Sequence, residues 1–207
     1  MLQIKSLKKI YRDQLVLNID QLSISEGFYW IKGENGSGKS TLLKCIAGLI
    51  PFEGNINLFG VENNKQNLKD YRSLVRYAIA EPDFPDFLKG TDLIKLYENV
   101  TEANPKQIAE ITKKLGVDKF QHRKIGEYSS GMAKKLSIAL AFISNPKLIL
   151  LDEPFSTLDA ETGKILIELI EDYLPKGTSF IVTSHQDFEH HLAVEVLHLQ
   201  SQHLTPA

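Results

Sequence analysis

Residues 33–40 read Gly-Glu-Asn-Gly-Ser-Gly-Lys-Ser and match the pattern G-x-x-x-x-G-K-[ST]. A compact apolar segment, Phe28 to Ile31, precedes this stretch, and an apolar pattern at helical spacing, Leu42 to Ala47, follows it. A strand that passes through a glycine-rich turn into a helix lets successive backbone N–H groups converge on phosphate oxygens, and the helix dipole strengthens the attraction. The stretch therefore predicts a phosphate-binding loop.

The pattern also predicts what individual residues of this loop do. Lys39 would reach the β- and γ-phosphates of a nucleotide, and the Ser40 hydroxyl would ligate Mg²⁺. A chance match is expected in fewer than ~1 in 100 chains of this length, so ATP with Mg²⁺ is the predicted ligand. The residues expected to contact the nucleotide here are Gly33, Glu34, Asn35, Gly36, Ser37, Gly38, Lys39, Ser40 and Thr41.

An acidic pair lies far from this loop in the sequence. The apolar run from Leu148 to Leu151 leads directly into Asp152 and Glu153, at the carboxyl end of a predicted buried strand, where open α/β sheets bind their ligands. We expect Asp152 to hold the Mg²⁺ shell. We expect Glu153 to activate water as a general base, which contributes ~10² to 10⁴ in rate. The alternative is two acids that only end a strand before a turn, and the phosphate-binding loop makes it the weaker reading.

The rest of the chain alternates strands with helices. Residues 1–25 alternate weakly in polarity, which predicts short antiparallel strands, and the continuous apolar segments predict a mostly parallel sheet with helices on both faces. Residues 56–59 and 74–79 are predicted as a further strand pair around a polar loop, and the last residues as a closing hairpin. The predicted fold class is α/β: a P-loop NTPase core with a mostly parallel sheet and an N-terminal antiparallel β subdomain.

Residues 82–128 differ in texture from the rest. They hold three prolines and helical patterns at 92–99 and 105–115, without a convincing strand. We therefore expect a helical lobe inserted into the core. The prediction is one domain of 207 residues, in which 1–81 and 129–207 form the catalytic α/β core.

Composition and charge argue against several classes of protein. Hydrophobic residues make up 43% and charged residues 24% of the chain, and the net charge is −2, which gives no sign of a surface that coats nucleic acid. No apolar run approaches the ~18 residues needed to cross a bilayer. The single cysteine, Cys45, cannot form an internal disulfide. We expect a cytoplasmic protein that reaches a membrane only through another chain.

Three further segments occur in an order that indicates a family. Tyr-Ser-Ser-Gly-Met at 128–132 begins a predicted helix before the acidic strand, Ser-Thr-Leu-Asp at 156–159 follows the acidic pair, and His185 follows the strand at 180–183. With the phosphate loop and the acidic strand, these segments resemble the signature, D-loop and switch histidine of the ATP-binding cassette (ABC) ATPases. The resemblance covers nearly the whole chain.

The resemblance implies a site shared between two chains. In this family two domains face head to tail, so Ser129 and Gly131 would contact the nucleotide of a second copy. Asp159 of the D-loop is also expected to bind nucleotide. The residues themselves allow this, because a serine-capped helix start binds anions, but they also allow a capped helix and nothing more. The resemblance further implies that His185 contacts the γ-phosphate and that Tyr11 stacks on adenine, although Tyr11 could also be a surface tyrosine.

The sequence departs from the family at two places. The signature has a methionine, Met132, where the commonest form has glutamine. The family also has a glutamine loop that helps to hold Mg²⁺, and an ungapped alignment puts Ala80 at the position of that glutamine. Glu81 is the nearest side chain able to bind a metal, so Glu81 joins Ser40 and Asp152 as an expected metal ligand.

The resemblance implies an ATPase subunit that dimerises on ATP and powers transport through a separately encoded transmembrane permease. A soluble ABC-type module acting on ribosomes or DNA is the alternative, but tandem cassettes, zinc cysteines and long heptad runs are lacking and no nucleic-acid partner is expected. A small-molecule kinase is a third reading, and it would not need a second phosphate-binding helix start. The transported substrate and its direction do not follow from the sequence.

Overall fold

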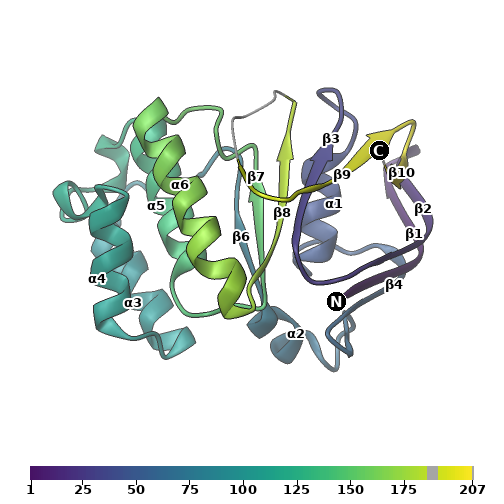
Figure 1. Cartoon of the computed structure of the whole chain (residues 1–207), viewed down its shortest axis with the longest axis horizontal. Helices are drawn as coiled ribbons and strands as arrows, with labels where there is room; N and C mark the ends of the chain where they lie inside the picture. Colours follow the sequence, from purple (N-terminus) through teal and green to yellow (C-terminus); the bar gives the residue numbers. More distant parts are fainter. Residues whose placement is uncertain (186–190, 207) are drawn as a thin grey trace.

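The computed structural model describes residues 1–185 and 191–206, which form two sheets with helices around them (Figure 1). The first sheet is antiparallel, with the strand order β2-β1-β4-β5. The second has the order β10-β9-β3-β8-β7-β6 and is parallel except for the β9–β10 hairpin. The strands are β1 (Leu2–Tyr11), β2 (Gln14–Ile24), β3 (Phe28–Lys32), β4 (Glu53–Leu58), β5 (Val61–Glu62), β6 (Val75–Ala78), β7 (Leu148–Asp152), β8 (Ser179–Ser184), β9 (Glu195–Gln200) and β10 (His203–Pro206).

The helices connect these strands and cover the parallel sheet. They are α1 (Lys39–Ile46), α2 (Leu68–Leu74), α3 (Gly90–Thr101), α4 (Pro105–Lys114), α5 (Ser130–Phe142) and α6 (Ala160–Tyr173), with single 3₁₀ turns η1 (Val117–Lys119), η2 (Ile125–Glu127) and η3 (Leu174–Lys176). The mostly parallel sheet, the N-terminal antiparallel strands and the final hairpin agree with the sequence prediction. Within the described part of the chain, no helix is both long and apolar enough to cross a bilayer.

The two strands predicted around 56–59 and 74–79 are present as β4 and β6, but two details of that prediction are wrong. Strands β4 and β6 lie in different sheets, and the residues just before β6 form the short helix α2. Tyr71 explains the helix: its ring is fully buried and its hydroxyl donates to the Ile46 carbonyl, 2.6 Å away, at the end of α1. Arg72 donates to the Gly48 carbonyl just beyond α1. Helix α2 thus satisfies backbone carbonyls that α1 leaves free.

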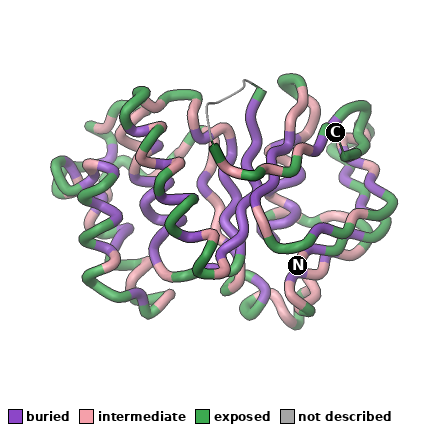
Figure 2. The backbone as a smooth tube through the Cα atoms, in the orientation of Figure 1, coloured by how far each residue is buried: buried purple, intermediate pink, exposed green. Residues whose placement is uncertain are grey.

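The parallel sheet is buried on both faces because successive residues of each strand point to opposite sides. In β7, Ile149 and Leu151 pack into one hydrophobic cluster with α5 and α6, whereas Leu148 and Leu150 pack into another with α1 and the antiparallel sheet. Figure 2 shows the resulting buried band through the middle of the molecule. This burial fixes the strand ends, where the functional residues lie.

Helices α3 and α4 occupy one end of the molecule and the antiparallel sheet the other (Figure 1). The helical patterns at 92–99 and 105–115 correspond to α3 and α4, and residues 82–128 contain no strand beyond an isolated bridge between Lys89 and Lys124. Ile108 and Ile111 of α4 join the same hydrophobic cluster as α5. The helical segment therefore packs on the sheet through α5.

Candidate functional site

The loop 33–38 has a backbone that only glycine fits at two places. Gly38, the N-cap of α1, has φ 103°, and a Cβ there would lie 3.1–3.2 Å from Leu17 and Val16. A Cβ on Gly33 would lie 2.6 Å from the Leu199 carbonyl oxygen. No side chain caps α1, so its first N–H groups remain available to an anion. The exposed residues Glu34, Asn35 and Gly36 form the rim of the loop, and Ser37, Ser40 and Thr41 are half-buried.

Lys39 lies under this loop and is 6% exposed. Its ammonium donates to the carbonyls of Gly33 and Glu34, at 2.7 and 3.1 Å. It also lies 3.4 Å from a carboxylate oxygen of Glu153. The loop and the acidic strand, 112 residues or more apart in sequence, therefore meet at one ammonium.

Asp152 is the centre of a hydrogen-bond network at the carboxyl end of β7. Its Oδ1 accepts from Ser40 Oγ at 3.0 Å and from Thr183 Oγ1 at 2.8 Å. Its Oδ2 accepts from the Tyr77 hydroxyl at 2.7 Å. Burial and the negative charge of Asp152 raise the pKa of Tyr77 far above its usual value, so this hydroxyl keeps its proton and donates. The carboxylate is thereby held in one orientation.

The oxygens around Asp152 fit Mg²⁺. A hard cation prefers oxygen ligands, and in an octahedron with bonds of ~2.1 Å neighbouring ligands stand ~3 Å apart. Ser40 Oγ and Asp152 Oδ1 are 3.0 Å apart. Ser40 and Asp152 can therefore occupy two adjacent positions of a magnesium shell once the Ser40 proton turns away from the carboxylate.

Glu153 has a strained backbone with φ 44°, in the left-handed region that non-glycine residues rarely adopt. Its N–H donates to both the carbonyl and the hydroxyl oxygen of Thr183, each at 3.1 Å, which holds the turn in place. One carboxylate oxygen faces Lys39, and the other lies 3.0 Å from Nδ1 of His185. The strained turn thus aims the carboxylate at the mouth of the phosphate loop.

The segment Tyr128 to Met132 begins helix α5 as the sequence predicts. Ser129 is the N-cap, and its hydroxyl accepts from the Met132 N–H at 3.2 Å. Ser129 and Ser130 are exposed. Tyr128 points the other way, since its hydroxyl donates to the Phe120 carbonyl and its ring packs edge-on against Phe120.

The start of α5 touches the start of α6. Asp159 caps α6 by accepting from the N–H and the hydroxyl of Thr162, both at 2.8 Å. The same carboxylate accepts from Lys135 of α5 at 2.9 Å. A Cβ on Gly131 would lie 3.2 Å from the Thr157 carbonyl oxygen. The signature and D-loop segments of one chain therefore form a joined, exposed surface.

The remaining predicted site residues lie at the edges. Tyr11 is 45% exposed, and the Lys9 ammonium, which donates to the Pro51 carbonyl, lies 4.6 Å from its ring centre. Glu81 is exposed at the turn after β6. The neighbouring Ala80 contributes its backbone carbonyl to Lys134. These placements leave the proposed contacts of Tyr11 with adenine and of Glu81 with a metal as predictions.

Sequence reasoning missed three residues at the acidic pair: Tyr77, Thr183 and Lys134. Each carried a signal. Thr183 is a polar residue in the apolar strand β8, and Lys134 interrupts the buried face of α5. Tyr77 lies in the strand next to β7, close to the sheet edge that holds Asp152. Their partners are distant in sequence, so only the folded chain brings them together.

Comparison with known proteins identifies the family of this chain. The sequence model of the ABC transporter family matches residues 17–156. The lantibiotic transport ATP-binding protein SrtF of Streptococcus pyogenes is 32% identical over 187 residues, covering 89% of this chain and 80% of SrtF. The cytochrome c biogenesis ATP-binding export protein CcmA of Histophilus somni (strain 129Pt) is 30% identical over 174 residues, covering 83% of this chain and 79% of CcmA.

Solved structures share the fold. A dimeric bacterial ABC transporter cassette superposes with a TM-score of 0.88 at 24% identity, covering 99% of this chain and 96% of that chain. At this identity the likeness shows the architecture alone, whereas the family match rests on the sequence. With its phosphate loop, acidic strand and signature helix in the order of the ATP-binding cassettes, this chain belongs to the ABC transporter family, as an ATP-binding protein.

Proposed function

We propose that this chain hydrolyses ATP to ADP and phosphate with Glu153 as the general base. The contact that carries the proposal is the Glu153 carboxylate, held 3.4 Å from the Lys39 ammonium and 3.0 Å from His185. Phosphoryl transfer requires a positioned water, a base that takes its proton, and cations around the transferred group. In this proposal Glu153 is the base, His185 positions the water, and Lys39 is one of the cations.

We infer the steps of hydrolysis from these positions. On nucleotide binding, Lys39 exchanges the Gly33 and Glu34 carbonyls for phosphate oxygens, which frees the Glu153 carboxylate from the ammonium. A water oxygen attacks the γ-phosphorus while the bond from phosphorus to the bridging oxygen of ADP breaks. Glu153 accepts the water proton, and His185 orients the water and the γ-phosphate.

Ser40 and Asp152 would hold Mg²⁺, with Glu81 of the turn after β6 as a further ligand. The metal would offset the charge of the phosphate oxygens. In a Glu81→Ala variant we expect the Mg²⁺ dependence of hydrolysis to move to higher concentration. An unchanged Mg²⁺ titration would remove Glu81 from the metal site.

The signature surface supports a site completed by a second copy of the chain. Ser129, Gly131 and Asp159 lie together at the joined starts of α5 and α6, and Ser129 is exposed. The same chain already holds Lys39 and Glu153 at its own phosphate loop. We propose an ATP-dependent homodimer in which each signature contacts the nucleotide of the other copy.

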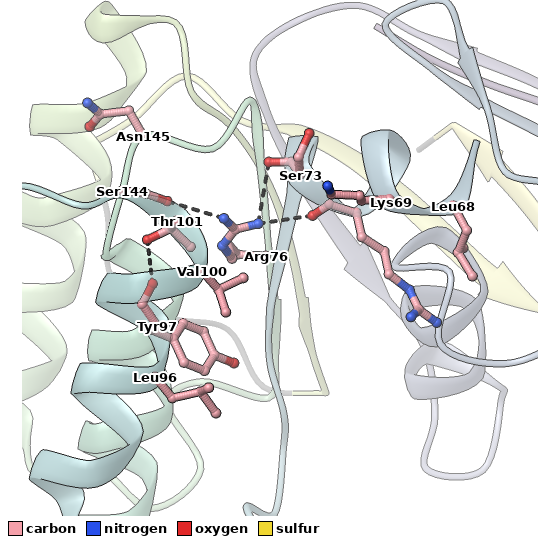
Figure 3. A pocket seen from close by; sticks show the side chains of 11 residues that line it. Leu68, Lys69, Ser73, Arg76, Leu96, Tyr97, Val100, Thr101, Ser144 and Asn145 are labelled. Atoms are coloured by element: carbon pink, nitrogen blue, oxygen red, sulfur yellow. Dashed lines mark hydrogen bonds between the residues drawn. The ribbon is translucent and has the colours of Figure 1, made fainter. Parts of the chain in front are cut away.

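The relatives support transport as the work that hydrolysis drives, since SrtF and CcmA are named for transport and export. We propose a separately encoded transmembrane permease as partner, with this chain on the cytoplasmic face of the membrane. A cavity of about 920 Å³ between α2 and α3 offers a docking place (Figure 3). Leu96 and Val100 are 54% and 75% exposed at its edge, and Arg76 crosses it to the Ser144 hydroxyl.

The docking proposal has its own test. Val100→Asp puts a charge in the apolar part of this cavity and should reduce the protein recovered with washed membranes of its host. Lys164→Asp, on the exposed side of α6, is the matched control. Equal membrane recovery of the two variants would place the partner elsewhere.

The experiment that tests the shared site is light scattering on purified Glu153→Gln protein, with and without ATP and Mg²⁺. Loss of the base should allow binding without turnover, so the closed dimer accumulates. We expect a monomer without nucleotide and a dimer with it. A nucleotide-bound monomer at all protein concentrations would contradict the shared site.

A further inference from the structure

Lys134 is a lysine with no exposed surface, on helix α5, five residues after the signature cap. Its ammonium donates to three backbone carbonyls: Ile79 at 3.2 Å, Ala80 at 2.8 Å and Asp152 at 2.8 Å. An ammonium has three donors, so every donor is used.

These carbonyls continue two neighbouring strands beyond the point where their pairing stops. Strands β6 and β7 are paired in parallel as far as Ala78 and Leu151. The next residues, Ile79 and Ala80 on one side and Asp152 on the other, have Lys134 between them in place of strand hydrogen bonds. The ammonium therefore holds the turn after β6 and the metal-ligand strand β7 at a fixed separation.

Three carboxylates near Lys134 favour its charged form, which opposes the effect of burial. Burial lowers its pKa to about 8, while Asp152, Glu153 and Glu81 raise it. A buried ammonium is costly unless its donors are hydrogen-bonded, and all three donors of Lys134 are used here. An apolar side chain in its place would leave three buried carbonyls without this donor.

We propose that Lys134 is a positioning residue for hydrolysis, which holds the Ala80–Glu81 turn and the Asp152 backbone in the arrangement that Mg²⁺ requires. The side chain at Ala80 has no polar atom, so this turn depends on its backbone for its connection to the acidic strand. Because Lys134 and Ser129 belong to one helix, the connection also ties the metal site of this chain to the surface that would contact the second copy. This inference rests on the proposed ATPase function.

The test measures Mg²⁺-dependent binding of a fluorescent, non-hydrolysable ATP analogue, followed by ATP turnover. Lys134→Met keeps the length of the side chain and removes the donors and the charge. Lys134→Gln keeps two donors without the charge and decides the question if the methionine variant does not fold. Lys114→Met removes an exposed lysine that pairs with Asp172 at 2.8 Å, far from the acidic pair in sequence, and serves as the control. Circular dichroism establishes that each protein is folded.

For Lys134→Met we expect the Mg²⁺ concentration at half-maximal analogue binding to rise about 10-fold or more, as for the loss of a residue that orients metal ligands. For Lys134→Gln we expect a smaller rise. Binding in EDTA should change less than 2-fold, and the control should match wild type. An unchanged Mg²⁺ midpoint in folded Lys134→Gln and Lys134→Met, or an equal loss in EDTA, would overturn the inference. A wild-type protein that binds Mg²⁺-ATP and never hydrolyses it, alone or with its permease, would instead contradict the proposed function.

Discussion

Two helix starts in the described part of the chain are suited to anions, and they differ in what surrounds them. Helix α1 begins at Gly38 without a side-chain cap, and Lys39 and Glu153 of the same chain surround its start. Helix α5 begins at Ser129, which caps its own helix and is exposed. The first start therefore has the proposed reacting groups beside it, whereas the recorded neighbours of the second are Thr157 and Asp159 of the D-loop. The proposed shared site would join the first start of one chain to the second start of another.

The largest expected effect comes from the first helix start. Glu153→Gln removes the base and keeps the shape, so kcat should fall ~10²- to 10⁴-fold while ATP binding persists. Steady-state phosphate release and equilibrium nucleotide binding measure the two quantities. Turnover at the wild-type rate would show that another group takes the proton.

A change at the second helix start is expected to weaken the pairing of two chains more than the binding of nucleotide to one chain. Gly131→Ala places a Cβ 3.2 Å from the Thr157 carbonyl oxygen. If the added Cβ shifts the start of α5 and removes one hydrogen bond to a phosphate of the other copy's nucleotide, the loss is ~1.5 to 3 kcal/mol. Turnover should then fall about 10-fold or more. Nucleotide binding by the monomer should remain.

A glycine on α6 provides the matched control for this variant. A Cβ on Gly163 would meet only Phe155, at an ordinary 3.8 Å. Gly163→Ala should therefore keep the wild-type turnover. If both alanine variants behave alike, the signature surface has no special part in hydrolysis.

Asp159 connects the signature surface to helix α6, and its loss should affect stability modestly. Lys135 and the Thr162 groups hold the pKa of Asp159 well below its usual value. Asp159→Ala removes the cap of α6, which costs about 1 kcal/mol and lowers Tm by about 2–4 °C for a domain of this size. Asp159→Asn retains a capping oxygen and loses only an exposed ion pair, so its Tm should stay close to wild type. Differential scanning fluorimetry separates the two.

The smallest effect concerns Cys45, near the end of α1. Burial raises its pKa to about 12, although Lys9 opposes this in part, so at pH 8 only about one thiol in 10⁴ is ionised. Alkylation by iodoacetamide should therefore require opening of the core around α1. ATP at four times its Kd should slow the reaction about 5-fold. An alkylation rate that does not change with ATP would show that nucleotide binding does not stabilise the core around α1.

Much of this molecule follows from local patterns. The phosphate loop, strand β7 and helix α5 were predicted because their apolar spacing and glycines encode them over a few residues. Helix α2 was missed because one buried tyrosine and an arginine that bonds to the end of α1 decide it. The contacts of Asp152 with Tyr77 and Thr183 were missed for a related reason. These contacts join strands that are adjacent in the sheet but distant in sequence. A single sequence does not show which strands are neighbours.

The left-handed backbone at Glu153 has a consequence for protein engineering. A residue with a Cβ costs ~1 to 2 kcal/mol in that region relative to glycine, so Glu153→Gly should relax the turn after β7. Where this gain exceeds the lost contacts of the carboxylate with Lys39 and His185, selection of variants by heat resistance alone would favour the loss of the carboxylate. A set of thermostable variants selected without an activity screen would then be enriched in Glu153→Gly proteins that fold but do not hydrolyse ATP.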